Sequence, residues 1–248
     1  MTTPMSFGKR PLLESNVVSQ RPILSEYFDL ARDIFGFAVV TMTTPEYAGV
    51  DDRLASSCRR VKRGEATLPI ARFRGQSLGG WARNCALKPL VMLKAAQMFG
   101  MPILWLDADS EIPNTKAAHE AIARLADGKS GIGGATIAAF CPALSPSYKK
   151  RFPLINSNLC SGTLWVGEGR TGESILVAWA TRCAADPEQL DQESLWDVAK
   201  GIVSPMCPEL CCIPDLMPSV VEPIVVHHQA SRTMREVVDS GGSISPRN

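Results

Sequence analysis

Residues 103–110 read ILWLDADS: four apolar residues and then two acids, Asp107 and Asp109, one residue apart. A short apolar run of this kind is typical of a strand that is buried on both faces of a parallel sheet. Ligands of open α/β sheets bind beyond the carboxyl ends of the strands. Side chains two residues apart in an extended chain also point to the same side. Because two adjacent carboxylates repel each other unless a cation lies between them, the pair predicts a divalent-cation site that is completed by phosphate oxygens. The alternative is a pair of solvated turn residues before the next helix.

The segments around this stretch alternate between strand and helix patterns. A second buried strand is expected over residues 35–42, and a helix is expected over 88–99, with Pro89 in its first turn and Gly100 after its end. The other expected elements are helices at 51–62, 114–126 (capped by Asn114), 174–185 and 191–200, and strands at 68–73, 131–140, 159–166 and 224–226. This order predicts an α/β fold with a mostly parallel central sheet flanked by helices.

The same pattern suggests a simple domain organisation. We expect a flexible N-terminal arm over residues 1–22, one domain over 23–239, and a flexible tail over 240–248, which is rich in Gly, Ser and Pro. The sequence contains no internal repeat and no linker that would divide the chain.

The composition narrows the functional classes. The chain has 248 residues with 26 basic and 25 acidic side chains, and 45% of its residues are hydrophobic. This argues against a disordered chain and against a protein that binds nucleic acid through a general excess of positive charge, although a local basic groove is still compatible. The first twenty residues do not resemble a secretory signal, and no apolar stretch is long enough to span a bilayer. We therefore expect a cytoplasmic protein.

The cysteines agree with that compartment. The eight cysteines are irregularly spaced, and the group Cys207, Cys211 and Cys212 fits no familiar zinc pattern. We expect reduced thiols, most of which are small core residues.

Five further stretches, together with the Asp-x-Asp motif, resemble a known family. They are VVTMTT (39–44) followed by Tyr47, WARNCALKP (81–89), SGTLW (161–165), DQESLW (191–196) and HHQASR (227–232). Their types and order, over about residues 35–235, resemble GT-A-type glycosyltransferases, which have a single Rossmann-like domain. One departure is Cys160, where many relatives have Asn; Asn156 and Asn158 lie nearby.

The resemblance implies a metal-dependent enzyme that moves a sugar from a nucleoside-diphosphate sugar, most often a UDP-sugar, to a hydroxyl acceptor. The acceptor is a glycan, a protein, a small molecule or a hydroxylated DNA base. By the same resemblance, Asp109 binds the Mn2+ or Mg2+ ion directly, whereas Asp107 holds the ribose or the metal less directly. The implied donor-binding residues are Thr41, Thr43, Tyr47, Lys88, Asp107, Asp109, Ser231 and Arg232, and those on the acceptor side are Ser161, Gly162, Thr163 and Trp165.

Two adjacent histidines, His227 and His228, are candidates to complete the metal site. Because side chains alternate along a strand, at most one of them is expected to bind the metal. The resemblance favours His227, and the alternative is that both are structural.

Asp191 and Gln192 are the candidate catalytic residues. If the enzyme inverts configuration, Asp191 is a candidate base; if it retains configuration, both residues position the donor sugar. Asp191 is also placed to act as a helix N-cap. Lys88 is unusual in the first turn of a helix, and a phosphate or carboxylate partner would explain it.

Basic residues are frequent between positions 59 and 83. They form either a solvated face or a site for an anionic acceptor, and their members are Arg59, Arg60, Lys62, Arg63, Arg72, Arg74 and Arg83.

Two other functions compete with the transferase. A sugar-nucleotide nucleotidyltransferase requires a glycine-rich phosphate loop after the first strand, but residues 41–50 contain only Gly49. A non-catalytic nucleotide-sugar-binding protein of the same fold is the second alternative, and the intact acids and histidine argue against it.

Overall fold

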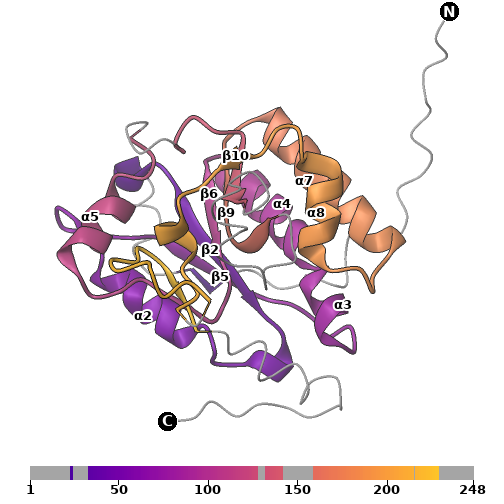
Figure 1. Cartoon of the computed structure of the whole chain (residues 1–248), viewed down its shortest axis with the longest axis horizontal. Coiled ribbons are helices and arrows are strands. Elements are labelled where there is room, and N and C mark those ends of the chain that lie inside the picture. Colours follow the sequence, from indigo (N-terminus) through magenta and orange to yellow (C-terminus); the bar gives the residue numbers. More distant parts are fainter. Residues whose placement is uncertain (1–22, 25–32, 128–131, 142–158, 215, 229–248) are drawn as a thin grey trace, which may run out of the picture.

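The computed structural model describes residues 23–24, 33–127, 132–141, 159–214 and 216–228. A seven-stranded sheet with the order β1-β5-β2-β6-β9-β8-β10 forms its centre (Figure 1). The strands are β1 (Ile23–Leu24), β2 (Ala38–Thr43), β5 (Ile70–Arg74), β6 (Ile103–Leu106), β8 (Ile137–Phe140), β9 (Cys160–Val166) and β10 (Ser204–Pro205). Five of them run in one direction, and only β1 and β9 run antiparallel to their neighbours. The predicted α/β fold with a mostly parallel sheet is therefore confirmed.

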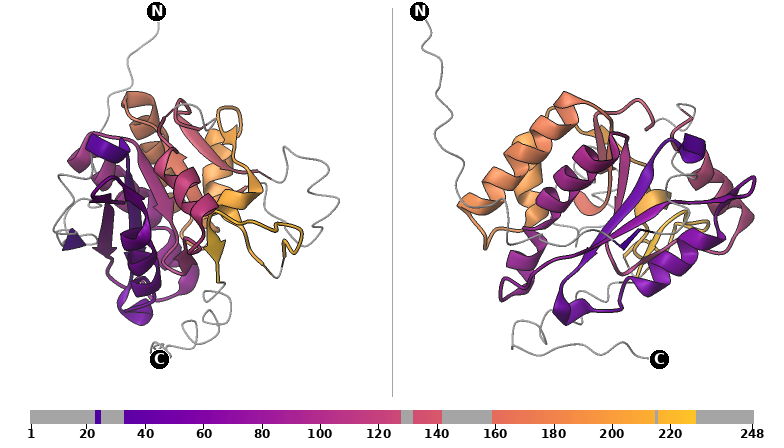
Figure 2. Two further views of the ribbon diagram at one scale, coloured as in Figure 1. Left: turned by 90° about the vertical axis from the view of Figure 1, so that its left-hand side faces the viewer. Right: turned by 180° about the vertical axis from the view of Figure 1, so that it is seen from behind.

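Helices cover both faces of this sheet (Figures 1 and 2). The helices α4 (Lys88–Phe99), α7 (Arg170–Ala185) and α8 (Asp191–Ala199) share one hydrophobic cluster with the sheet. The helices α2 (Asp52–Arg60) and α5 (Lys116–Ala123) share a second cluster on the opposite face. The result is a three-layer α/β/α arrangement with two cores.

Strand β6 shows why the sequence forms this architecture. All four of its side chains are buried. Ile103 and Trp105 belong to the core on the α4 side, whereas Leu104 and Leu106 belong to the core on the α2 side. Each such side chain contributes about 1.5–3 kcal/mol when it is fully buried. The two acids that follow β6 are thus held at a fixed position at the carboxyl edge of the sheet.

Short elements complete the described fold. They are the 3-10 turns η1 (Pro45–Tyr47) and η3 (Pro208–Cys211), the helix α3 (Trp81–Cys85), the hairpin β3 (Lys62–Arg63) with β4 (Ala66–Thr67), and the antiparallel pair β7 (Ser110–Glu111) with β11 (Val226–His227). Apart from β11, these short elements were not predicted, because none of them is long enough to show a periodic sequence pattern.

Several boundaries differ from the sequence-based expectation. Helix α4 has the predicted limits, and Gly100 ends it with a φ of 57°. Helix α5 is shorter than predicted and is capped by Thr115 instead of Asn114, because the Thr115 side chain accepts a hydrogen bond from the Ala118 amide. Helix α7 begins at Arg170, β8 covers only the last four residues of its predicted range, and β11 begins two residues later than predicted.

The predicted flexible arm, residues 1–22, and the predicted tail, residues 240–248, lie outside the described residues. Among the described residues, the structure contains no helix with the length and apolar character needed to cross a membrane.

Candidate functional site

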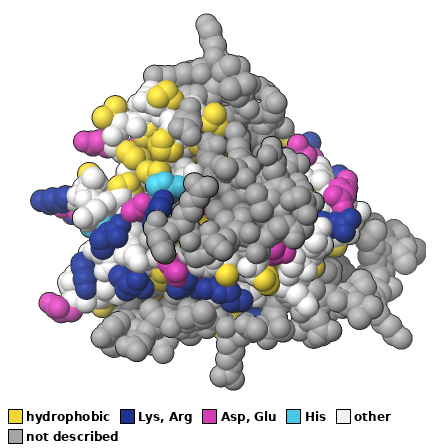
Figure 3. All heavy atoms as spheres, turned by 90° about the horizontal axis from the view of Figure 1, so that it is seen from below, with side chains coloured by type: hydrophobic (Ala, Val, Ile, Leu, Met, Phe, Trp, Pro, Cys, Tyr) yellow, Lys and Arg dark blue, Asp and Glu magenta, His cyan; other side chains and the backbone are white. Residues whose placement is uncertain are grey.

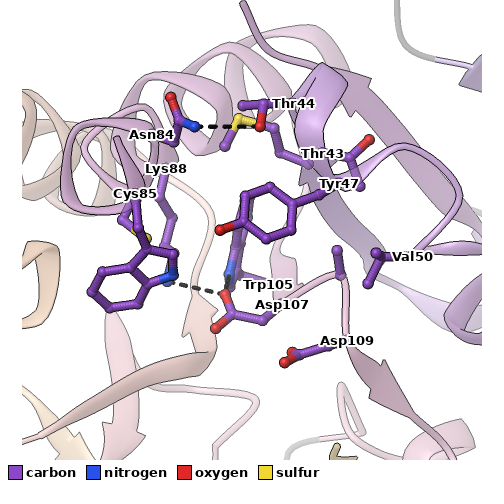
Figure 4. Close-up of a pocket in the computed structure, with 13 residues that line it drawn as sticks. Thr43, Thr44, Tyr47, Val50, Asn84, Cys85, Lys88, Trp105, Asp107 and Asp109 are labelled. Atoms are coloured by element: carbon purple, nitrogen blue, oxygen red, sulfur yellow. Dashed lines mark hydrogen bonds and ion pairs between the residues drawn. The ribbon is translucent and has the colours of Figure 1, made fainter. Parts of the chain in front are cut away.

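A pocket opens at the carboxyl edge of β2 and β6. Its walls come from β2, η1, α3, the start of α4 and the turn after β6 (Figure 4). The lining residues are Met42, Thr43, Thr44, Tyr47, Val50, Trp81, Asn84, Cys85, Lys88, Trp105, Asp107, Ala108 and Asp109. Most of this surface is apolar or aromatic, and the charged groups gather at one end.

Three potential metal ligands meet at that end. Asp107 and Asp109 follow β6, and each of the two acids and His227 offers a ligand atom within 4.8 Å of the others. The backbone explains how so distant a histidine reaches them. Strand β11 pairs with β7, which directly follows the acids, and the register places His227 opposite Ser110. The His227 amide also donates to the carbonyl of Cys212 at 2.8 Å.

The His227 ring is buried among hydroxyl groups. Its Nδ1 lies 3.0 Å from Ser110 Oγ, and its Nε2 lies 2.8 Å from Thr163 Oγ1. Burial lowers the pKa of His227 below its usual value, although the charges of Asp109 and Asp107 act in the opposite direction. The neutral imidazole is therefore favoured at neutral pH, and this is the form that binds metals.

His228 has a different environment from its neighbour. Its Nε2 lies 3.1 Å from Glu111 Oε2, and about a third of its side chain is exposed. Its amide donates to the carbonyl of Asp109 at 3.1 Å. The alternation inferred from the sequence agrees with this geometry, in which only His227 joins the two acids.

The two carboxylate oxygens of Asp107 have different surroundings, because one contacts Trp105 and Lys88 and the other lies on the side of His227. Its Oδ1 accepts a hydrogen bond from Trp105 Nε1 at 2.8 Å and lies 3.0 Å from Lys88 Nζ. Burial raises the pKa of Asp107, but the charges of Lys88 and His227 and these two hydrogen bonds bring it below its ordinary value. A Cβ added at Gly162 would lie 2.9 Å from His227 Cε1 and 3.3 Å from Asp107 Oδ2. Only glycine therefore fits between the histidine and the second oxygen of Asp107.

Lys88 is a buried cation shared by two acids. Only 4% of Lys88 is exposed, and its Nζ lies 3.0 Å from Asp107 Oδ1 and 3.0 Å from Asp191 Oδ2. The carbonyl of Ser161 accepts from the same Nζ at 3.1 Å. Burial alone would lower the pKa of Lys88, but the two carboxylates raise it above its ordinary value. The charge in the first turn of α4 is thus explained by carboxylate partners.

Asp191 is held firmly at the start of α8. It is 4% exposed, and its Oδ2 accepts a hydrogen bond from Ser161 Oγ at 2.8 Å in addition to the Lys88 contact. Its carbonyl accepts from Trp179 Nε1 at 2.8 Å. The N-cap position is occupied by Leu190, so the interpretation of Asp191 as the helix cap is wrong. Gln192 follows and is half-buried.

The remaining predicted donor residues are divided between the pocket, the core and the undescribed tail. Thr43 and Tyr47 line the pocket. Thr41 is fully buried and does not line it. Ser231 and Arg232 lie outside the described residues. Figure 4 shows Asp107 and Asp109 close together at one end of the pocket, with Thr43 and Thr44 nearer the other end.

The residues predicted for the acceptor side also separate. Ser161 contacts Lys88 and Asp191, and Thr163 contacts His227. Trp165, however, is fully buried in the core, with its ring centroid 5.6 Å from that of Phe37. Ser161 and Thr163 lie near the carboxyl edge of the sheet, whereas Trp165 lies further along β9, opposite Leu104, and packs in the core on the α2 side.

A second charged cluster next to the pocket was not anticipated from the sequence. The fully buried carboxylate of Asp51 accepts two hydrogen bonds from Arg72, of 2.6 and 2.8 Å, and one from Arg74, of 2.9 Å. Arg74 also donates to Thr43 Oγ1 at 2.5 Å. Burial raises the pKa of Asp51, but the two guanidinium groups bring it below its usual value. A usable signal was present, because alternate residues of a strand, here Arg72 and Arg74, face the same side.

The basic run between residues 59 and 83 is largely paired with acids. Its ion pairs are Arg60–Glu111, Arg63–Asp127, Arg72–Asp51, Arg74–Asp51 and Arg83–Glu188. Figure 3 shows basic side chains gathered on one face with acidic side chains among them. The pairs of Arg60, Arg63 and Arg83 are partly exposed, whereas Arg72 and Arg74 hold the buried Asp51.

Comparison with known proteins gives a structural match without a sequence match. No protein-family model and no curated protein matches the chain. A solved glycosyltransferase involved in glycosylation of the major capsid of PBCV-1 is similar, with a TM-score of 0.61, 13% identity, and coverage of 81% of this chain and 97% of that chain. The glycosyltransferase GlyE of Streptococcus pneumoniae TIGR4 matches with a TM-score of 0.49 and 14% identity, over 78% of this chain and 54% of that chain.

The capsid-associated enzyme is similar over nearly its whole length, and this supports a shared architecture. The arrangement of the central sheet, with the Asp107-Ala108-Asp109 motif after β6, agrees with that result. The chain therefore has the fold of the GT-A-type glycosyltransferases.

Proposed function

We propose that this protein is a metal-dependent glycosyltransferase that transfers a sugar from a nucleoside-diphosphate sugar to a hydroxyl acceptor. The observation that carries the proposal is the meeting of Asp107, Asp109 and His227 at one end of an apolar pocket. An apolar pocket with a few convergent polar groups is the usual form of a small-molecule site. An aromatic lining next to a cation site suits a nucleoside diphosphate, whose base is flat and whose phosphates are anionic.

The three ligand groups fit a divalent cation in both charge and type. Asp107 and Asp191 share the buried cation Lys88, and Asp109 lies beside Asp107 at the same end of the pocket. Carboxylate oxygens suit Mg2+ and Mn2+, and the neutral imidazole of His227 favours Mn2+. Asp109 and the free Oδ2 of Asp107 are the proposed oxygen ligands. When bound, the ion neutralises the diphosphate as the sugar–phosphate bond breaks.

The other residues are proposed to bind and orient the donor. Thr43 and Tyr47 line the pocket and are proposed to contact the base and ribose. Lys88 fixes Asp107 on one side and Asp191 on the other, which links the metal end to the predicted catalytic residues. Asp191 and Gln192 at the start of α8 are proposed to face the donor sugar. Ser161 and Thr163 support Asp191 and His227, respectively.

The proposed UDP donor and the metal can be tested together by thermal unfolding. UDP, GDP, CDP, ADP and dTDP are each added to the full chain with and without Mn2+. A ligand at a hundred times its Kd stabilises the fold by about 2.7 kcal/mol, which corresponds to a rise in Tm of about 5–10 °C for a chain of this size. We expect one nucleotide, with UDP as the first candidate, to produce that rise in Tm, and to do so only when Mn2+ is present.

A second measurement distinguishes an enzyme from a binding protein. The sugar derivative of the selected nucleotide is incubated with Mn2+, and release of the nucleoside diphosphate is followed. Release that is lost in Asp109→Asn and kept in Asp52→Asn, a change at an exposed helix residue, supports the transferase. Absence of any nucleotide-dependent shift contradicts the proposal. A shift without release or transfer favours a non-catalytic nucleotide-sugar-binding protein.

A further inference from the structure

Two thiols lie in contact beside the candidate site. Cys160 is the first residue of β9 and Cys211 is the last residue of η3, and their sulfurs are 3.2 Å apart. The two residues are 51 positions apart in the sequence, so the fold brings them together. Cys160 is partly exposed, whereas Cys211 is fully buried. Cys160 is therefore the member of the pair nearer the surface, and the Cys211 sulfur lies directly against it.

The local hydrogen bonds give the two thiols different roles. The Cys211 S–H donates to the Cys160 sulfur. This bond and the amide of Gly162 lower the pKa of Cys160, although burial acts in the opposite direction. The same sulfur–sulfur bond and burial raise the pKa of Cys211 well above its usual value. Because the thiolate is the reacting form, Cys160 is the nucleophile of the pair.

Other thiols among the described residues lack this combination of contact and activation. Burial raises the pKa of Cys58 to about 12 and the pKa values of Cys141 and Cys183 to about 11. Cys207 is exposed, but burial of its sulfur raises its pKa as well. Selective oxidation at Cys160 is therefore expected from both geometry and environment.

We propose that Cys160 and Cys211 form a dithiol site that a small disulfide, such as glutathione disulfide, converts reversibly into an intrachain disulfide. The Cys160 thiolate attacks one sulfur of glutathione disulfide, forms a mixed disulfide and releases one glutathione thiolate. Cys211 then loses its proton, and its sulfur attacks the Cys160 sulfur and releases the second glutathione. The balanced reaction consumes two protein thiols and one glutathione disulfide and gives one protein disulfide and two glutathiones.

The position of the pair connects this chemistry to the site. Cys160 directly precedes Ser161, which contacts Lys88 and Asp191, and Cys211 directly precedes Cys212, whose carbonyl holds the His227 amide. A disulfide between Cys160 and Cys211 would therefore shift the backbone next to Ser161 and next to the Cys212 carbonyl, and both of these groups hold residues of the proposed site. This consequence rests on the proposed function, and we expect oxidation to lower the affinity for Mn2+ about 10-fold, as changes in groups that support ligands commonly do.

Peptide mapping of the full chain tests the dithiol without using any metal or donor. The protein is fully reduced and equilibrated with buffers of increasing ratio of glutathione disulfide to glutathione. It is then quenched with acid and alkylated in denaturant, and its mass is measured by mass spectrometry. We expect two of the eight thiols to escape alkylation and a return to eight after dithiothreitol. Trypsin places Cys160 in peptide 152–170 and Cys211 in peptide 201–232, and cleavage after Glu209 separates Cys211 from Cys207. Fragmentation of the linked peptide then identifies Cys211 against Cys212.

Variants and outcomes make the test selective. Cys160→Ser and Cys211→Ala are expected to keep all their remaining thiols free, whereas the control Cys183→Ser still loses two. A link to Cys141, Cys207 or Cys212, a stable mixed disulfide only, or eight free thiols under oxidising conditions would overturn the proposal. Mn2+ titration of the reduced and oxidised protein then tests the consequence: equal affinities would reject the effect on the site but leave the dithiol standing. Failure of the glycosyltransferase proposal would leave the mapping result unaffected.

Discussion

Two clusters of buried charge lie at the carboxyl edge of the sheet, and they differ in balance. Around Asp51, two acids are matched by two arginines, because Arg72 also contacts Asp52. Around Lys88, Asp107 and Asp191 share a single buried cation, and Asp109 lies beside Asp107. In the first cluster each acid contacts an arginine, whereas in the second two carboxylates lie against one ammonium group. The second cluster, which includes the potential ligands Asp107, Asp109 and His227, is the proposed cation site, and the first supports the end of β2.

The largest expected effect comes from removing the shared cation. Lys88→Met leaves the buried Asp191 and the partly exposed Asp107 without their counter-charge, so the free energy of unfolding should fall by about 3 kcal/mol. Urea unfolding measures this loss. We also expect Mn2+ to restore part of it, because a cation between the acids replaces some of the lost attraction. A loss of 1 kcal/mol or less would show that Lys88 is not the residue that balances these acids.

Breaking the balanced cluster should have a smaller effect that depends on pH but not on Mn2+. Asp51→Asn leaves two partly exposed arginines without their acid and should cost about 2–3 kcal/mol at pH 7. The pKa of Asp51 is lower in the folded protein than in the unfolded chain, where it is about 3.9. Its contribution to the free energy of unfolding is therefore fully present above about pH 3.9 and disappears as the pH falls through the pKa of the folded state. Unfolding at a series of pH values should therefore show wild type and variant converging in acid.

A matched substitution in the Asp51 cluster separates the effect of losing a buried charge on stability from the effect of losing an exposed charge. Asp52 contacts Arg72 but is 70% exposed, so Asp52→Asn should change stability by about 0.5 kcal/mol or less. A cost for Asp52→Asn as large as that for Asp51→Asn would mean that the buried position of Asp51 is unimportant.

The two histidines allow a finer comparison within the metal end. His227→Ala should weaken Mn2+ binding about 10- to 100-fold, because it removes one proposed ligand. His228→Ala loses only the partly exposed contact with Glu111 and should change the affinity less than about 2-fold, as expected for an exposed pair. Calorimetric titration of both variants measures the difference, and equal effects would contradict the choice of His227.

Local sequence patterns predicted the elements that carry the site better than the contacts within it. The apolar run before Asp107 and the Pro89 and Gly100 signals of α4 gave correct elements, because each depends on neighbouring residues alone. Alternation correctly separated His227 from His228. Trp165 lies in the core and not at the site, because alternation gives the face that a side chain occupies but not its distance from the sheet edge.

Long-range pairing could not be derived in the same way. The Lys88 side chain meets Ser161 across 73 residues and Asp191 from a still later helix, and nothing in the local pattern specifies either contact. The contact of Ser110 with His227 likewise follows from the pairing of β7 with β11, which is too short to give a periodic signal. These contacts are properties of the folded sheet edge.

The central claim is that the unbalanced acid cluster binds a divalent cation together with a nucleotide. Electron paramagnetic resonance of free Mn2+ during titration of the full chain, with the nucleotide selected by thermal unfolding, measures this directly. The account predicts one bound Mn2+ per chain for wild type, a loss of affinity of about 100-fold for Asp109→Asn, and wild-type binding for Asp51→Asn at pH 7. Unchanged binding in Asp109→Asn, or no binding by wild type, would contradict it.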